Sequence, residues 1–96
     1  MRLVWRPSAL IDLEDIWAYS ERQFGTEQTA AYVRGLQAKV GLLATGDLSG
    51  TAQNDVEPGL RRQLVGSHAI WFRVDGDVLR VIRVLHQSRD VGRWVA

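Results

Sequence analysis

The chain has 96 residues, enough for one domain with a modest core, and it contains no cysteine, which excludes disulfides, thiolate metal ligands and cysteine nucleophiles. The formal net charge is only +1, but residues 1–59 carry five basic and eight acidic side chains, whereas residues 60–96 carry seven and three. The basic C-terminal part predicts an acidic partner, an acidic segment of the same chain that docks there, or an arginine-rich face that keeps the sheet soluble.

The first residues predict a strand followed by a helix. Side chains alternate over Arg2–Trp5, as in a strand, and Pro7 suits the first turn of a helix, where an N–H has no partner within the helix. Gly25 is a natural helix end. One apolar stripe is expected to face the core: Leu10, Leu13, Trp17 and Phe24. Three carboxylates are interpreted as charges near the positive end of the helix dipole: Asp12, Glu14 and Asp15.

A second helix is predicted from Thr26, whose hydroxyl suits an N-cap. Its apolar seam consists of Val33, Leu36, Val40 and Leu43. Gly35 and Gly41 weaken this helix by about 1 kcal/mol each relative to alanine, and either is expected to mark a close approach of the backbone. The short link makes the two helices an antiparallel hairpin. Residues 45–59 are polar and broken by glycine and proline, so they are predicted to form a loop.

The stretch from Leu60 to Asp90 predicts a three-stranded antiparallel meander. Its three apolar-rich runs are separated by Gly66-Ser67, typical of a type II′ turn, and by Asp75-Gly76, typical of a type I′ turn. Strand alternation places on one face of the middle strand Ile70, Phe72 and Val74. On one face of the last strand it places Val78, Ile82 and Val84, and on the other Leu79, Val81, Arg83 and Leu85.

The predicted fold is a single α+β domain over residues 1–96, in which the helical hairpin covers one face of the sheet. The residues expected to be buried are Leu13, Trp17, Val33, Leu36, Val40, Ile70, Phe72, Val74 and Ile82. No run is long and apolar enough to cross a membrane, and the N-terminus lacks the apolar core of a signal peptide. We therefore expect a cytoplasmic protein that makes no membrane contact.

Few residues offer acid–base or metal chemistry. No histidine and carboxylate cluster has metal-ligand spacing, and no glycine-rich phosphate loop follows a strand, so no metal or cofactor is expected. A ribonuclease could be built from His86 with Arg61 and Arg83. The alternative is that His86 hydrogen-bonds a loop carbonyl or Asp90 and fixes the turn after the last strand. His68 is interpreted as a hydrogen bonder that fixes the turn before the middle strand.

Several motifs resemble the ParE branch of the RelE/ParE toxin superfamily, in order and over nearly the whole chain. They are Pro7-x-Ala9, Asp12-Leu13-x-x-Ile16-Trp17-x-Tyr19, Phe24-Gly25 before Ala31-Tyr32-x-x-x-Leu36, Gly59-Leu60-Arg61, His68-x-Ile70-Trp71-Phe72-Arg73-Val74, and Arg83-Val84-Leu85-His86-Gln87-Ser88-Arg89-Asp90. One departure lies in the loop, where members often have a proline and an arginine around a glycine and this chain has Asp47-Leu48-Ser49-Gly50-Thr51.

The resemblance implies the toxin of a type II toxin–antitoxin system. A ParE-type toxin inhibits DNA gyrase by binding, without catalysis, and a ParD-like antitoxin with a ribbon-helix-helix N-terminus holds it inactive in a hetero-oligomer. The alternative within the same superfamily is a RelE-type, ribosome-dependent mRNA endonuclease. The poor inventory of acid–base residues favours the gyrase inhibitor.

A partner-binding surface is predicted on the meander, because the last strand alternates arginines with large apolar groups. Such a surface suits an acidic and apolar antitoxin segment that folds on binding. The candidate partner-binding residues are Arg61, Arg73, Arg80, Arg83, Arg89, Trp71 and Trp94. In the opposing interpretation, Trp71, Leu79 and Trp94 cover one another within the chain and leave no site. Trp5 and Trp17 are assigned to the core.

Overall fold

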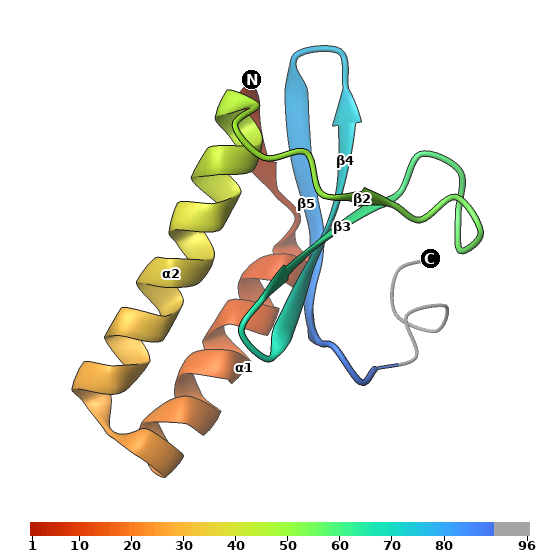
Figure 1. Cartoon of the computed structure of the whole chain (residues 1–96). Helices are drawn as coiled ribbons and strands as arrows, with labels where there is room; N and C mark the ends of the chain where they lie inside the picture. The colour runs from red at the N-terminus through yellow and green to blue at the C-terminus, as the bar shows by residue number, and fades with distance from the viewer. Residues whose placement is uncertain (90–96) are drawn as a thin grey trace.

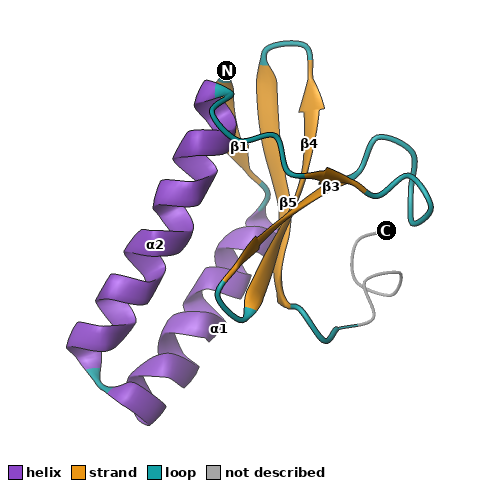
Figure 2. Cartoon of the chain, viewed as in Figure 1, coloured by secondary structure: helices purple, strands orange, loops and turns teal. Residues whose placement is uncertain are grey.

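Within residues 1–89, which the computed structural model describes, five strands form one sheet and two helices cover the same face of it (Figures 1 and 2). The elements are β1 (Arg2–Trp5), α1 (Pro7–Phe24), α2 (Thr26–Thr45), β2 (Thr51–Ala52), β3 (Arg61–Val65), β4 (His68–Asp75) and β5 (Val78–His86). The strand order across the sheet is β1-β5-β4-β3-β2. The predicted α+β fold, with an N-terminal strand, a helical hairpin and an antiparallel meander, is confirmed.

The meander is extended at both edges. β1 lies parallel to β5, with Leu3 beside Leu79, and β2 adds two residues antiparallel to β3. The prediction of a loop over residues 45–59 missed β2, which is too short to leave a periodic pattern. Gly50 precedes β2 with φ +64°, and a Cβ there would lie 2.7 Å from the Arg62 carbonyl oxygen. A side chain therefore cannot replace this glycine without a shift of the backbone.

The main core lies between the helices and the sheet. Its buried members are Ala9, Ile16, Leu36, Val40, Leu43, Ile70, Phe72, Leu79, Val81 and Val84. Of the nine residues predicted to be buried, six are: Val33, Leu36, Val40, Ile70, Phe72 and Ile82. Leu13 and Trp17 are only half-buried. Val74 is 41% exposed, and it is the next-to-last residue of β4, beside the β4–β5 turn.

The face that α1 buries is rotated from the predicted one. Its buried residues are Ala9, Asp12, Ile16 and Ser20. Leu10 and Phe24 are 47% and 58% exposed, so the predicted stripe was wrong at both ends. Small side chains let this face approach the sheet closely, and Asp12 has a partner there, described below. In α2 the predicted seam is confirmed, but a Cβ on Gly35 or Gly41 would have nothing within 4 Å, so neither glycine marks a close approach.

A β-bulge in β5 explains the errors in the predicted faces of this strand. Trp71 pairs with Arg83 and Phe72 pairs with Val81, which leaves Ile82 as the extra residue. Leu79 and Val81 consequently face the helices with Phe72, whereas Ile82 faces away from them. The first turn of α1 binds the bulge, because the Ser8 hydroxyl donates to the Ile82 carbonyl oxygen at 3.2 Å.

Both hairpin turns use a glycine with positive φ. Gly66 (φ +56°) begins the two-residue loop between β3 and β4, as predicted. Between β4 and β5 the loop is Gly76–Asp77 rather than Asp75-Gly76, and only Gly76 has positive φ, at +61°. That pattern fits a type II′ turn, so the predicted type I′ turn was wrong in both position and type.

The face of the sheet that points away from the helices carries a second, smaller apolar cluster. Its members are Leu60, Ala69, Trp71, Ile82 and Leu85. Leu60 comes from the segment that leads into β3, which runs on this side of the sheet (Figure 1). Neither helix combines the length and the hydropathy that a membrane span requires.

Candidate functional site

Asp12 on α1 and Arg83 on β5 form a bidentate ion pair at the β-bulge. The Arg83 Nε and Nη2 atoms donate to Asp12 Oδ2 and Oδ1, each at 2.7 Å. The Val84 backbone N–H donates to the same carboxylate at 2.9 Å. The side chains of Arg83 and Asp12 are only 17% and 8% exposed, and the hydrogen bond that Arg83 donates to Asp12 raises the pKa of the Arg83 guanidinium. The interpretation of Asp12 as a surface charge near the helix start was therefore wrong, because it is a buried anchor between α1 and the sheet.

Beside this ion pair lies an open groove of about 920 Å³ between the helices and the carboxyl end of β5. α1 contributes Tyr19 and Phe24, and α2 contributes Thr29 and Tyr32. From the sheet come His68, Arg83 and His86, and Arg89 follows just beyond β5. We call this space the histidine groove. It unites three of the residues singled out in the sequence, Arg83, His86 and Arg89, with His68.

His68 is held from the helical hairpin. Its Nδ1 lies 2.6 Å from the Tyr32 hydroxyl, and the two rings meet edge to face. The same hydroxyl accepts the Ser67 backbone N–H at 3.1 Å and lies 3.3 Å from the Val65 carbonyl oxygen. Tyr32 therefore fixes the β3–β4 turn, a role that the sequence interpretation gave to His68. Burial, and secondarily the nearby His86, lower the pKa of His68 below its ordinary value.

His86 stabilises the turn that follows β5. Its Nδ1 accepts the Ser88 backbone N–H at 3.2 Å and lies 2.8 Å from the Ser88 hydroxyl. The predicted role in this turn is right, but the partner is Ser88; Asp90 lies outside the described residues. His68 and His86 are direct partners across β4 and β5, and their rings meet edge to face with centroids 5.6 Å apart.

Two of the arginines that were predicted to bind a partner form hydrogen bonds with segments of their own chain. Arg61 donates from Nε to the Ser49 carbonyl oxygen at 2.8 Å, beside β2. Arg73 donates to the Pro58 carbonyl oxygen at 2.7 Å and pairs with Glu57 at 2.6 Å. The acidic N-terminal part of the chain thus supplies partners to the basic part. Arg61 does not line the histidine groove, so the predicted nuclease set of His86, Arg61 and Arg83 is not brought together.

Other candidates share the sheet face that carries the second apolar cluster. Trp71 is 5% exposed within that cluster, and the Arg62 guanidinium lies 5.6 Å from its ring centroid. Arg73 and Arg80 are cross-strand partners on this same face, since they alternate with Phe72 and Val81 of the main core. Trp94 lies outside the described residues.

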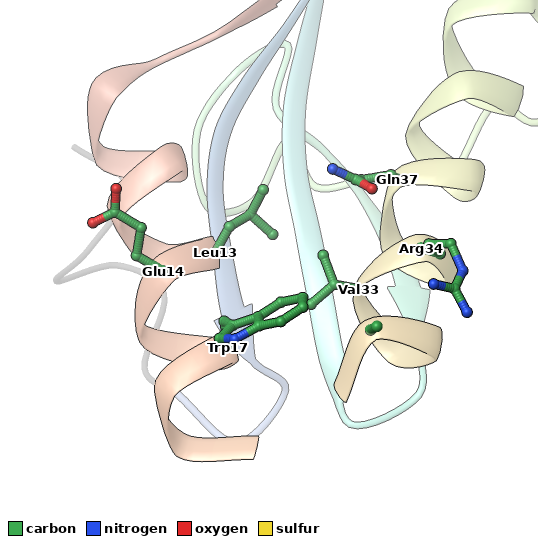
Figure 3. Close-up of a pocket in the computed structure, with 7 residues that line it drawn as sticks. Leu13, Glu14, Trp17, Val33, Arg34 and Gln37 are labelled. Carbon is green, nitrogen blue, oxygen red and sulfur yellow. The ribbon is translucent and has the colours of Figure 1, made fainter. Parts of the chain in front are cut away.

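A second groove, of about 540 Å³, separates the two helices (Figure 3). Leu13 and Trp17 of α1 and Val33 of α2 point into it. Ala30 and three polar side chains complete its lining: Glu14, Arg34 and Gln37. We call it the interhelical groove. Its three larger apolar residues were predicted to be core, yet Leu13 and Trp17 remain partly open to solvent.

Comparison with known proteins identifies the family. The model of the "ParE toxin of type II toxin-antitoxin system, parDE" family matches residues 3–91. The chain belongs to this ParE family. It is 45% identical to Toxin ParE1 of Caulobacter vibrioides over 80 residues, which cover 83% of this chain and 82% of that protein. It is 37% identical to Toxin ParE1 of Mycobacterium tuberculosis over 93 residues, which cover 96% and 95% of the two chains.

A solved structure shares the ParE fold. The chain superposes on a protein of the "Chromosomal ParDE TA system from P. aeruginosa" with a TM-score of 0.78 and 24% sequence identity, over 90% of this chain and 95% of that one. The family assignment from sequence motifs is therefore confirmed, and the fold agrees with it. Within residues 1–89 of this ParE-type chain, no three histidine or carboxylate side chains are grouped as metal ligands would be.

Proposed function

We propose that this ParE-type toxin inhibits DNA gyrase by binding, in the cytoplasm, and that a cognate antitoxin neutralises it. The observation that carries the proposal is the match to the ParE toxin family along residues 3–91, together with two curated ParE1 toxins that align over most of their length. The geometry supports binding over RNA cleavage, because Arg61, which would stabilise a phosphorane beside His86, is bound near β2 instead.

The test is a gyrase assay with purified toxin and plasmid DNA. We expect cleaved gyrase–DNA complexes to accumulate, and expression without antitoxin to stop replication and induce the DNA-damage response. The opposite result is specific cleavage of ribosome-bound mRNA that His86→Ala abolishes. That outcome would establish the RelE-type endonuclease instead, since His86 is the only predicted acid–base residue at the end of β5.

The antitoxin is proposed to be ParD-like, with a ribbon-helix-helix N-terminus and a C-terminal segment that folds on the toxin as a hetero-oligomer. The interhelical groove offers four apolar side chains beside three polar ones, which suits the apolar face of an amphipathic helix. The opposite face of the sheet offers Arg73 and Arg80 beside Trp71. A segment that wraps the toxin would contact both surfaces, and the remaining predicted contacts are Arg61, Arg83, Arg89 and Trp94.

Calorimetric titration of an antitoxin C-terminal peptide tests the two surfaces separately. Trp17→Ala removes the largest side chain of the interhelical groove, and we expect affinity to fall about tenfold or more, as for a partly open aromatic anchor. Arg80→Glu should weaken binding and raise its salt sensitivity. Arg22→Glu, on an exposed turn at the end of α1, is the charge control. Equal affinities for the wild type and the three variants would show that the antitoxin peptide binds neither surface.

A further inference from the structure

His86, which lines the histidine groove, carries an N–H donor whose position on the ring is fixed. The Ser88 backbone N–H can only donate, so Nδ1 of His86 is the acceptor and the ring proton lies on Nε2. That Nε2–H has no hydrogen-bond partner among the described residues. It is therefore available to an acceptor that enters the groove.

His68 can supply a second hydrogen-bond donor while it keeps its hydrogen bond to the Tyr32 hydroxyl. The Tyr32 hydroxyl can donate to Nδ1 of His68, or it can accept from Nδ1 while donating to the Val65 carbonyl oxygen. Either arrangement keeps the Ser67 N–H bonded to the same hydroxyl. His68 can thus carry a proton on Nδ1, on Nε2 or on both, and a bound anion can draw the proton to Nε2.

The formal charges of the groove lining balance, with two arginines and two aspartates, so an anion would be held by hydrogen-bond donors rather than by net charge. Arg83 and Arg89 line it, and the Asp12 carboxylate is already occupied by Arg83 and the Val84 N–H. One further carboxylate, that of exposed Asp15, lies in the α1 wall. The lining also holds the buried hydroxyl of Thr29, which has no hydrogen-bond partner within the described part of the chain.

Exposed aromatic rings flank these donors. Tyr19 and Phe24 are each 58% exposed on α1, and both line the groove. Exposed rings next to cations are typical of sites where nucleic-acid bases stack. The volume of about 920 Å³ is large enough for a nucleotide, since small-molecule sites commonly measure about 300–1,000 Å³. Asp15 could then accept a hydrogen bond from a sugar hydroxyl or a base amino group.

We propose that the histidine groove binds the phosphate group of a nucleotide or of a nucleic-acid strand. The Nε2–H groups of His86 and His68 donate to the phosphate oxygens, the guanidinium group of Arg89 lies in the lining as a further donor, and a base stacks on Tyr19 or Phe24. The proposal goes beyond gyrase inhibition and does not depend on it, because it concerns direct binding to the purified toxin.

The first experiment is an NMR titration that follows the imidazole signals of His68 and His86. The probes are inorganic phosphate, thymidine monophosphate and a short single-stranded oligonucleotide, each added to the full-length chain. We expect both histidines to shift with one saturating curve. Tighter binding of the oligonucleotide than of the monophosphate identifies a strand as the ligand, and the reverse order identifies a free nucleotide. Shifts that no phosphate probe produces, but that an acidic peptide does, overturn the proposal.

Matched variants test the donors. His86→Asn keeps an oxygen that accepts the Ser88 N–H but has no group at the position of Nε2. We expect it to weaken binding about tenfold, the usual effect of losing one hydrogen bond to a charged group. Arg89→Gln should weaken binding similarly, whereas Arg2→Gln, exposed on β1 away from the groove, should leave it unchanged. Wild-type affinity in His86→Asn, or an equal loss in Arg2→Gln, overturns the proposal, provided that circular dichroism shows folded protein.

Discussion

The Asp12–Arg83 ion pair is expected to be one of the most sensitive points of the chain. Asp12→Ala would leave the Arg83 guanidinium and the Val84 N–H without their carboxylate in a site that is 8–17% exposed. We expect a loss of about 3–5 kcal/mol in the free energy of unfolding, as for other buried pairs that lose one partner. Urea denaturation with circular dichroism measures it.

The control for that variant is Asp15→Asn, an exposed carboxylate one turn further along α1. It should change the free energy of unfolding by no more than about 0.5 kcal/mol. Similar effects of the two variants would mean that the ion pair contributes nothing beyond a surface charge. A double variant, Asp12→Ala with Arg83→Met, should recover part of the loss, because it removes the buried charge that has lost its carboxylate.

His68 is expected to make stability depend on pH. Its pKa in the folded chain is lowered from the ordinary value of 6.5, by burial first and by His86 second, so the unfolded chain binds the proton more readily. Stability is then fully present above about pH 6.5 and declines as the pH falls through the lowered pKa. His68→Asn, whose side-chain oxygen can still accept the Tyr32 hydroxyl, should flatten this decline. Denaturation midpoints between pH 5 and pH 8 measure it, and parallel curves would contradict the assignment.

The residue-scale features that matter most here could not be predicted from the sequence. Asp12 was interpreted as one of three similar helix charges, because nothing local distinguishes it from Glu14 and Asp15. Its partner is 71 residues away, and only the fold joins them. Tyr32 was likewise noted only as part of a family motif, and no structural role was predicted for it. The motif search nevertheless found His86, Arg83 and Arg89, which the fold does place along one groove.

At the scale of elements, two glycines are expected to respond in opposite ways to alanine. Gly50 has φ +64°, and its Cβ would lie 2.7 Å from the Arg62 carbonyl oxygen, so Gly50→Ala should destabilise the chain by at least about 1–3 kcal/mol. Gly41 lies inside α2 with nothing within 4 Å of its Cβ, so Gly41→Ala should stabilise it by up to about 1 kcal/mol. Thermal unfolding of both variants checks the signs, and a stable Gly50→Ala protein would rule out this loop conformation.

The helical hairpin was predictable because its boundaries depend on local chemistry. Pro7 begins α1, Gly25 separates the helices with φ +84°, and the seam of α2 repeats at helical spacing. The bulge in β5 was not predictable, since it is held by Ser8, far away in the sequence. One extra residue reverses the alternation beyond it, which is why Ile82 and Leu79 were assigned to the wrong faces.

At the scale of the whole molecule, β1 joins the two ends of the described chain, because it pairs in parallel with β5. The Arg2 and Arg6 N–H groups donate to the Asp77 and Val81 carbonyl oxygens, so by alternation the Val4 N–H also faces β5 and the Leu3 N–H faces away. Val4→Pro should therefore destabilise the chain by about 1–3 kcal/mol more than Leu3→Pro, because it leaves a β5 carbonyl unpaired. Denaturant midpoints of the pair measure the difference, and equal midpoints would show that this edge adds little.

The position of β5 between β1 and β4 also has a consequence for protein synthesis. β5 is the last of the described strands to leave the ribosome, yet the two helices that pack on the sheet are synthesised before it. Translation adds about 5–20 residues per second, so the apolar seam of α2 stays uncovered for several seconds before the sheet that packs on it has been synthesised. During that interval neither the histidine groove nor the main core exists, because each takes one wall from β5. We therefore expect the described fold to be completed only after translation has passed His86.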